Sequence, residues 1–375
     1  MTPEGERLRV ALDANPLIHE RTGVGHFTAE VLAGLAARDD VATIAYAITR
    51  TGRNDLAGML PRGVRPATSW VPARVAYTMW AHSGWPLVEH WTGPVDVVHA
   101  TNFVSPPSRA PGVVTVHDLA FVTSPELCRP ESRGYEALLR RALVRGVTVH
   151  AVSDYVAATV RDHFGVDDHQ VVRVYEGAAP MLDRGDAGAG RELAGSSRYI
   201  LAIGTVEPRK NLPRLVRAFD ALAAEHTDLL LVVAGADGWG TAAFDATVGT
   251  SRAGDRVRRL GYVTDAQRAD LLAGASALAY PSLDEGFGHP PLEAMAASVP
   301  VVTARTGALP EVVGDAAVLV DPVDVDELAG ALGQVLDDDD LRARLVARGH
   351  ARVAEFPWSR AVDNLVALYR DVAAA

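Results

Sequence analysis

The sequence of 375 residues contains a single cysteine and a single lysine. Cys128 alone excludes an internal disulfide bond and a zinc site built from cysteines. All other basic residues, of 36 in total, are arginines, so Lys210 marks a position that suits a compact ammonium group. Long apolar runs are also missing, since none approaches the roughly 20 residues that span a bilayer. Residues 1–9 lack the apolar segment of a signal peptide, and we therefore expect a cytoplasmic protein.

Basic residues are also outnumbered by acidic ones. The formal net charge is −11 at pH 7, so the field of the whole protein repels a polyphosphate chain. We therefore expect no nucleic-acid partner, whereas the charge places little restriction on small ligands.

The length and a hydrophobic content of 48% predict two domains. In the first half, helical patterns separate five strand patterns, at residues 8–15, 42–48, 95–101, 113–117 and 147–152. This alternation predicts parallel, doubly wound α/β sheets, which bind ligands at the carboxyl ends of their strands. Residues 176–197 lose the hydrophobic periodicity and read as a linker. We expect domains at 1–180 and 198–355, joined by a linker at 181–197 and followed by a C-terminal helical segment at 356–375.

Three features of the first half are candidates for a site. Gly23 and Gly25 follow the first strand, but Thr28 occupies the third glycine position of a dinucleotide fingerprint. The pattern therefore supports a nicotinamide site only weakly, and a plain tight turn is the alternative. His117 ends a predicted strand and is either a core histidine or a ligand-binding one. Residues 69–91 contain four of the six tryptophans, and their helical spacing favours a buried core over an acceptor platform or a membrane-facing helix.

A stronger signal begins at Thr205, after a predicted strand at residues 199–204. The loop Thr-Val-Glu-Pro-Arg-Lys-Asn leads into a helix at 212–225, with Asn211 as its expected N-cap. Arg209 and Lys210 therefore precede a helix N-terminus, which predicts a site for an anion such as a diphosphate.

The second strong signal is the stretch from Tyr280 to Glu293. A buried strand ends at Tyr280, and glycines 286 and 288 interrupt regular structure before a proline-initiated helix. Glu285 then lies near the helix N-terminus and Glu293 in its first turn. Carboxylates accept hydrogen bonds from vicinal hydroxyls and the helix end favours phosphate, so the pair fits a sugar nucleotide. A capping box with one solvated glutamate is the alternative.

These two stretches carry a family resemblance. Glu285-Gly-Phe-Gly-x-Pro-x-Leu-Glu293 resembles the E-x7-E signature of the family 4 retaining glycosyltransferases, and the loop at 205–211 resembles their E-P-R-K-[GN] element. Thr205 departs from the family, many of whose members have an arginine there. The resemblance implies the GT-B fold, with two facing Rossmann-like domains and a C-terminal helix that returns to the first. It also implies a nucleoside diphosphate sugar donor, a hydroxyl-bearing acceptor, and neither metal nor other cofactor.

The resemblance further implies roles for individual residues. Arg209 and Lys210 would take the charge of the leaving diphosphate, Glu285 would lie beside the sugar, and His117 would orient the sugar. Donor-binding positions carried over from the family are Gly23, Gly25, Thr205, Tyr262, Val263, Gly286, Phe287, Gly288 and Glu293. Within the family, the motifs look most like mannosyl- and rhamnosyltransferases of polysaccharide biosynthesis, and GDP-mannose is the first donor expected.

Other functions stay open on the sequence alone. A sugar-nucleotide epimerase or a non-catalytic sugar-nucleotide-binding partner fits the same scaffold, and contact with a membrane surface is also undecided. Asp324-Val-Asp326 matches the D-x-D metal motif of the other glycosyltransferase fold but stands before a helix, so we expect it to cap that helix instead.

Overall fold

The computed structural model describes residues 7–18, 23–49, 55–178 and 185–375. The chain forms two compact units. Unit 1 contains Met1–Val122, Glu131–Gly177 and Trp358–Ala375, and unit 2 contains Thr123–Pro130 and Ala178–Pro357. Each unit is built around one parallel sheet, as the alternation of strands and helices predicts.

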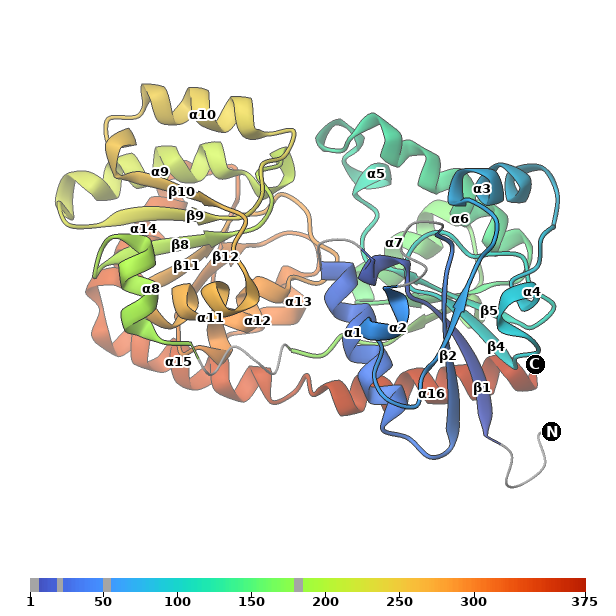
Figure 1. Cartoon of the computed structure of the whole chain (residues 1–375). Helices are drawn as coiled ribbons and strands as arrows, with labels where there is room; N and C mark the ends of the chain where they lie inside the picture. Colours follow the sequence, from blue (N-terminus) through green and yellow to red (C-terminus); the bar gives the residue numbers. More distant parts are fainter. Residues whose placement is uncertain (1–6, 19–22, 50–54, 179–184) are drawn as a thin grey trace. The chain divides into compact units, whose positions relative to one another are not determined.

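Unit 1 has a seven-stranded sheet in the order β3-β2-β1-β4-β5-β6-β7 (Figure 1). Its strands are β1 (Leu8–Asp13), β2 (Val41–Ala47), β3 (Arg65–Thr68), β4 (Val97–Ala100), β5 (Gly112–Val116), β6 (Thr148–Ala151) and β7 (Val171–Arg173). Its helices are α1 (Gly23–Ala36), α2 (Leu56–Met59), α3 (Ala73–His82), α4 (Glu89–Thr92), α5 (Ala120–Thr123), α6 (Gly134–Val144), α7 (Asp154–Phe164) and α16 (Trp358–Ala374). The central strands are nearly continuous apolar runs because helices cover both faces of the sheet.

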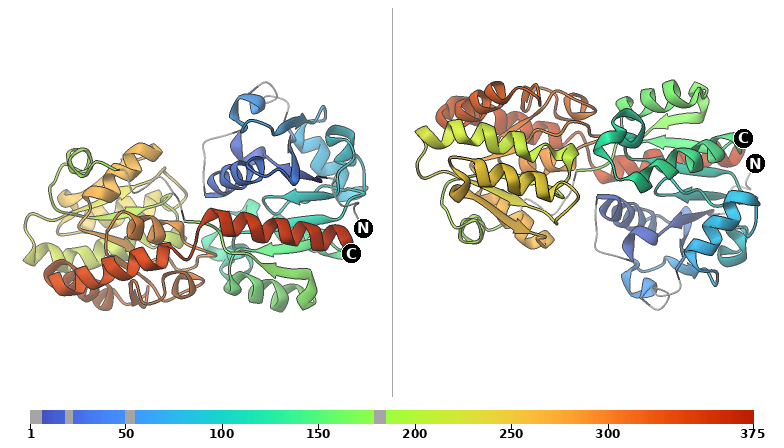
Figure 2. Two further views of the ribbon diagram at one scale, coloured as in Figure 1. Left: turned by 90° about the horizontal axis from the view of Figure 1, so that it is seen from below. Right: turned by 90° about the horizontal axis from the view of Figure 1, so that it is seen from above.

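The C-terminal helix α16 packs within unit 1, where it lies along the sheet and contacts α1, β4 and β5 (Figure 2). A buried chain of hydrogen bonds fixes it. Tyr369 Oη lies 2.6 Å from His99 Nδ1, His99 Nε2 lies 2.7 Å from Thr115 Oγ1, and Thr115 Oγ1 lies 2.9 Å from His150 Nδ1. His150 Nε2 lies 2.9 Å from the carbonyl oxygen of Val174.

The direction of each bond follows from the charge of the rings and the terminal carbonyl. Burial lowers the pKa of His99 well below its ordinary value and that of His150 to about 4, so both rings are neutral. A carbonyl only accepts, so His150 donates through Nε2 and its Nδ1 accepts from Thr115. Thr115 then accepts from His99 Nε2, and His99 Nδ1 accepts from Tyr369.

Unit 2 has a six-stranded sheet in the order β10-β9-β8-β11-β12-β13 (Figure 1). Its strands are β8 (Tyr199–Ile203), β9 (Leu230–Ala234), β10 (Val257–Gly261), β11 (Ala277–Tyr280), β12 (Val301–Ala304) and β13 (Val318–Val320). Its helices are α8 (Ala187–Ala194), α9 (Leu212–Glu225), α10 (Thr241–Thr250), α11 (Asp265–Gly274), α12 (His289–Ala296), α13 (Leu309–Val313), α14 (Val325–Asp337) and α15 (Asp339–Val353). The strand order reverses between β8 and β11, and ligands of such sheets bind outside the carboxyl ends of the strands at this switch point.

Two local predictions are corrected by the structure. Part of the predicted linker is helix α8. Its N-cap residue, Asp186, accepts hydrogen bonds from the N–H groups of Gly188 and Ala189. The helix packs so closely on α11 that a Cβ on Gly190 would clash with the Asp270 carbonyl oxygen. Small residues are therefore needed at this contact, and they give α8 little of the hydrophobic periodicity by which a helix is predicted. Gly23 and Gly25 belong to the start of α1 and not to a turn before it; the preceding residues 19–22 lie outside the described part.

Two further details concern side chains at helix starts. Asp324 caps α14, as predicted, by accepting hydrogen bonds of 2.9 Å from the N–H groups of Asp326 and Glu327. Thr28, the residue that departs from the dinucleotide fingerprint, is buried and donates to the Val24 carbonyl at 2.8 Å. Its side chain is therefore satisfied within α1.

Candidate active site

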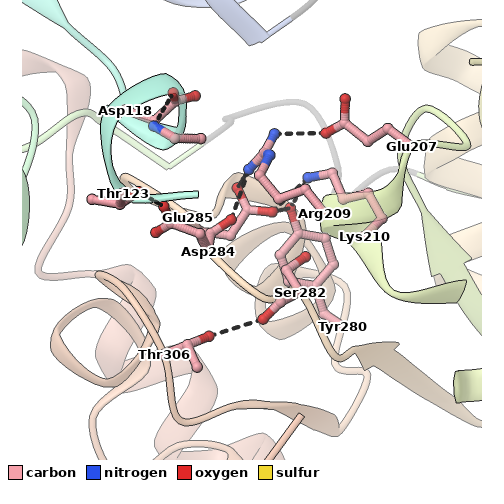
Figure 3. A network of polar contacts seen from close by, with 11 residues as sticks. Asp118, Thr123, Glu207, Arg209, Lys210, Tyr280, Ser282, Asp284, Glu285 and Thr306 are labelled. Carbon is pink, nitrogen blue, oxygen red and sulfur yellow. Dashed lines mark hydrogen bonds and ion pairs between the residues drawn. The ribbon is translucent and has the colours of Figure 1, made fainter. Parts of the chain in front are cut away.

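Two loops of unit 2 meet at the switch point between β8 and β11. The first runs from Gly204 to Asn211 after β8, and the second from Pro281 to Gly288 after β11. A hydrogen bond of 2.8 Å from the Leu283 N–H to the Arg209 carbonyl joins them. The sequence motifs that contain Arg209, Lys210 and Glu285 are thereby brought together (Figure 3).

Glu285 is the centre of this cluster. Its Oε1 accepts from Lys210 Nζ at 2.6 Å and from Tyr280 Oη at 2.8 Å, and its Oε2 lies 2.8 Å from Arg209 Nη1 (Figure 3). Burial alone would raise the pKa of Glu285, but Arg209 and then Lys210 outweigh it and lower the pKa to about 2. Burial lowers the pKa of Lys210, while Glu285 opposes that effect. Charged partners on both sides keep the carboxylate ionised.

Arg209 is held by a second carboxylate. Its Nη2 donates to Glu207 Oε1 at 2.8 Å, and its Nη1 also donates to the Asp284 carbonyl at 2.8 Å. Glu207 is buried, like Glu285. The cluster therefore has two cations balanced by two carboxylates, and none of the four side chains is more than 16% exposed.

Asn211 occupies the predicted N-cap position of α9, but its side chain fixes the end of the first loop and does not cap the helix. Its backbone is left-handed, with φ of 59°, and its side chain makes no capping bond to α9. The amide instead donates to the carbonyls of Pro281 and Pro322, at 3.0 and 2.6 Å. The left-handed turn directs the side chain toward the second loop, which it ties to the first.

Two glycines are required by the cluster itself. Gly204 has φ of +140°, and a Cβ there would lie 3.1 Å from Lys210 Cε. Gly307 has φ of +56°, and a Cβ there would lie 2.5 Å from the Glu285 carbonyl oxygen. Both positions combine a backbone conformation that favours glycine with close approach to a proposed catalytic residue.

Glu293 lies on the buried side of α12, beyond the first turn where it was predicted, because the helix already begins at His289. Its Oε1 lies 3.1 Å from Arg268 Nη1, whereas its Oε2 is buried and has no hydrogen-bond partner among the described residues. This oxygen is therefore an unused buried hydrogen-bond acceptor, the kind of group that a hydroxyl donor satisfies. The capping box is wrong, since α12 has no side-chain cap.

The other predicted donor positions of unit 2 differ in exposure. Phe287 is buried, with its ring centroid 5.8 Å from that of Phe356, and therefore contributes to packing. Gly288 is left-handed, with φ of 100°, at the N-cap of α12. Tyr262 follows β10 and is 53% exposed, while Thr205 follows β8 and is half-buried, as is Val263.

In unit 1, His117 follows β5 and is held at both ring nitrogens. Nδ1 lies 2.8 Å from Glu176 Oε1, and Nε2 lies 2.9 Å from the Thr101 carbonyl oxygen. Each ring nitrogen therefore already has a hydrogen-bond partner within unit 1. Binding a sugar hydroxyl through either nitrogen therefore requires that one of these bonds be replaced. Glu176 escaped prediction because it falls where the hydrophobic periodicity fades.

Comparisons with known proteins agree with this architecture. The family model for "Glycosyltransferase Family 4" matches residues 21–180, and that for "Glycosyl transferases group 1" matches residues 189–352. Over 288 residues the chain is 33% identical to O-antigen chain mannosyltransferase B of Escherichia coli, covering 73% of this chain and 74% of that one. Over 242 residues it is 34% identical to an MMP alpha-(1->4)-mannosyltransferase of Mycolicibacterium hassiacum, covering 63% and 57%.

Solved structures give the same result for the fold. Sucrose-phosphate synthase from Thermosynechococcus elongatus superposes with a TM-score of 0.76 at 20% identity, over 98% of this chain and 100% of that one. Anabaena HepE in complex with UDP-glucose gives 0.74 at 18% identity, over 97% and 100%. Two parallel sheets of seven and six strands with these neighbours define the GT-B fold. With the sequence matches, the chain belongs to the family 4 glycosyltransferases and is a hexosyltransferase.

Proposed function

We propose that this enzyme is a retaining, metal-independent transferase of the cytoplasm. It moves a hexose, in the first instance mannose from GDP-mannose, to a hydroxyl of a glycan, a glycolipid or a secondary metabolite. The names of the two relatives support mannose as the sugar, and the structure of the Anabaena protein with UDP-glucose supports a nucleoside diphosphate as the carrier.

The observation that carries the proposal is the pair of ion-paired cations Arg209 and Lys210, whose side chains are 16% and 12% exposed, at the switch point of unit 2. In the proposed reaction the bond from the sugar C1 to the diphosphate breaks, and the acceptor oxygen bonds to C1 on the same face. The acceptor proton passes to the departing phosphate oxygen. The leaving group gains negative charge in this step, and pre-positioned cations stabilise it in the transition state.

Lys210 is equipped for that contact. Its ammonium has three N–H donors, and in the described part of the chain it donates to Tyr280 and Glu285. One donor is left for a phosphate oxygen. The positive end of the α9 dipole, which follows directly, acts in the same direction.

The remaining site residues complete the proposal. The free oxygen of Glu293 accepts a ribose hydroxyl, the backbone around Tyr262 and Val263 holds the base, and the amides from Gly286 to Gly288 bind sugar hydroxyls. His117 orients the sugar, and Gly23 and Gly25 belong to the donor-binding positions, near the diphosphate and the acceptor. Thr205 contributes a hydroxyl where many family members have an arginine.

The test is release of nucleoside diphosphate from a panel of GDP-mannose, dTDP-rhamnose and UDP-glucose in the presence of EDTA. We expect GDP release from GDP-mannose that increases with added acceptor, and an α-linked product by NMR, since retention preserves the anomeric configuration of the donor. Conversion of the donor without net release would indicate an epimerase. Binding without either would indicate a sugar-nucleotide-binding protein.

Contact with a membrane surface is a separate part of the proposal. Among the described residues no helix is long and apolar enough to cross a membrane. Trp70 and Trp85 are 62% and 46% exposed, and Val75 on α3 is 48% exposed. Tryptophan favours the headgroup region of bilayers. We expect the wild-type enzyme to sediment with vesicles of phosphatidylcholine, which has no net charge to repel this acidic protein, and a Trp70→Ser, Trp85→Ser variant to stay in solution. Equal sedimentation would contradict this contact.

A further inference from the structure

We infer that Tyr280 is a positioning residue for sugar transfer, which holds the Lys210 ammonium and the Glu285 carboxylate in the arrangement that meets the departing diphosphate. The inference rests on the proposed function. Tyr280 lies outside both family motifs, at residues 205–211 and 285–293, and from the sequence it is the last residue of a buried strand.

The hydrogen bonds of Tyr280 have a defined direction. Its Oη lies 2.8 Å from Glu285 Oε1 and 2.6 Å from Lys210 Nζ. The carboxylate only accepts and the ammonium only donates, so the single phenolic proton goes to Glu285 while a lone pair accepts from Lys210. The hydroxyl therefore connects the two charged groups, which also bond directly to each other at 2.6 Å. Three polar groups form a closed triangle.

The environment keeps this hydroxyl in the form that the triangle requires. Tyr280 is 3% exposed, and burial followed by the nearby Glu285 charge raises its pKa well above the ordinary value. The phenol therefore stays protonated at working pH and remains a donor. Lys210 Nζ also lies 4.8 Å from the centroid of the Tyr280 ring, within the range of a cation–π contact.

Removal of the Tyr280 hydroxyl alone tests its effect on the positions of Lys210 and Glu285 without changing the packing of the ring. In Tyr280→Phe the ring, the core contacts and the cation–π contact are kept. One buried N–H of Lys210 loses its acceptor, and Glu285 Oε1 loses one of its two donors. The ammonium then has a single fixed partner and is free to turn away from the phosphate. Because transfer depends on where this charge lies in the transition state, the variant should be slow even when it binds the donor normally.

A matched control is available on the neighbouring strand. Tyr199 on β8 is fully buried, and its hydroxyl donates to the Leu271 carbonyl at 2.6 Å. Tyr199→Phe therefore removes a buried, hydrogen-bonded phenol from the same sheet without touching Lys210 or Glu285. Both substitutions should lower the melting temperature. A loss of stability alone would therefore change the kcat of the two variants to the same extent.

The first experiment compares kcat and the KM for the donor in the wild type and both variants. We expect Tyr280→Phe to reduce kcat by about 10- to 100-fold with the KM within about threefold of the wild type, and Tyr199→Phe to keep the wild-type kcat. Equal kcat values in Tyr280→Phe and Tyr199→Phe would overturn the inference. A rise in KM with an unchanged kcat would do the same, because it would assign Tyr280 to uniform binding.

The second experiment needs no turnover. Lys210 is the only lysine, so incorporation of [ε-13C]lysine gives one lysine NMR signal for the whole protein. The Tyr280 hydroxyl stabilises the ammonium by accepting from it, so its loss should lower the pKa of Lys210 in Tyr280→Phe but not in Tyr199→Phe. An unchanged Lys210 titration in Tyr280→Phe would overturn the inference. If the wild type releases no nucleoside diphosphate from any donor, the proposed function fails and the reaction role of Tyr280 fails with it, whatever the titration shows.

Discussion

Replacement of Lys210 by alanine is expected to reduce kcat for sugar transfer by about 100- to 1,000-fold, the effect of removing one pre-positioned donor from a developing anion. The substitution removes the only ammonium of the cluster and its remaining N–H donor. Glu285 keeps Arg209 and Tyr280 as partners, so its carboxylate is not left unpaired. The variant should therefore fold, and circular dichroism with a melting curve checks this before the kinetics are measured.

Arg217→Ala is the control for loss of positive charge. Arg217 is exposed on α9, the helix that follows Lys210, and lies outside the cluster. It should transfer sugar at the wild-type rate. Turnover by Lys210→Ala within a few-fold of the wild type would show that this ammonium does not stabilise the leaving group.

Glu285→Gln is the second substitution with a large expected effect, a loss of about 100-fold or more in kcat. Three groups donate to the Glu285 carboxylate: Arg209, Lys210 and Tyr280. A glutamine offers one oxygen and one NH2 group, so at least one donor would face another donor. That mismatch is buried and should cost roughly 1–3 kcal/mol of stability as well as misplace both cations.

The affinity for GDP distinguishes misplacement of the two cations in Glu285→Gln from loss of the nucleotide-binding site. Glu285→Gln removes one negative charge beside the two cations, so the affinity for GDP measured by calorimetry should stay the same or increase while kcat falls. Glu225→Gln, at the exposed end of α9, is the control and should behave as the wild type. Weaker GDP binding by Glu285→Gln, in parallel with the loss of transfer, would argue that the carboxylate acts only by holding the loops.

The sequence predicts those parts of the site that follow from chain topology. Parallel strands bring their carboxyl ends to one edge, so the loop with Arg209 and Lys210 and the loop with Glu285 were expected to meet, and they do. Partners supplied by distant or unremarkable positions were not predictable. Arg268 lies on α11 outside any motif, and Glu176 lies in a stretch that lacks hydrophobic periodicity.

The burial of individual side chains was also not predictable from the sequence, as the tryptophans of residues 69–91 show. Helical spacing favoured a core position for all four residues. Trp80 on α3 is buried, and its Nε1 donates to the Pro86 carbonyl at 2.9 Å. Trp70 and Trp85 lie before and after this helix and are exposed, with ring centroids 6.4 Å apart. Periodicity applies only within an element, and the bounds of α3 exclude both of these residues.

The central claim is that Lys210 contacts the diphosphate of the donor, and the single lysine signal of the [ε-13C]lysine-labelled enzyme tests it most directly. The signal should move in a saturable way as GDP is added and stay in place when guanosine, which lacks the phosphates, is added at the same concentrations. GDP binding that is measurable by calorimetry but leaves the Lys210 signal unmoved would contradict the account.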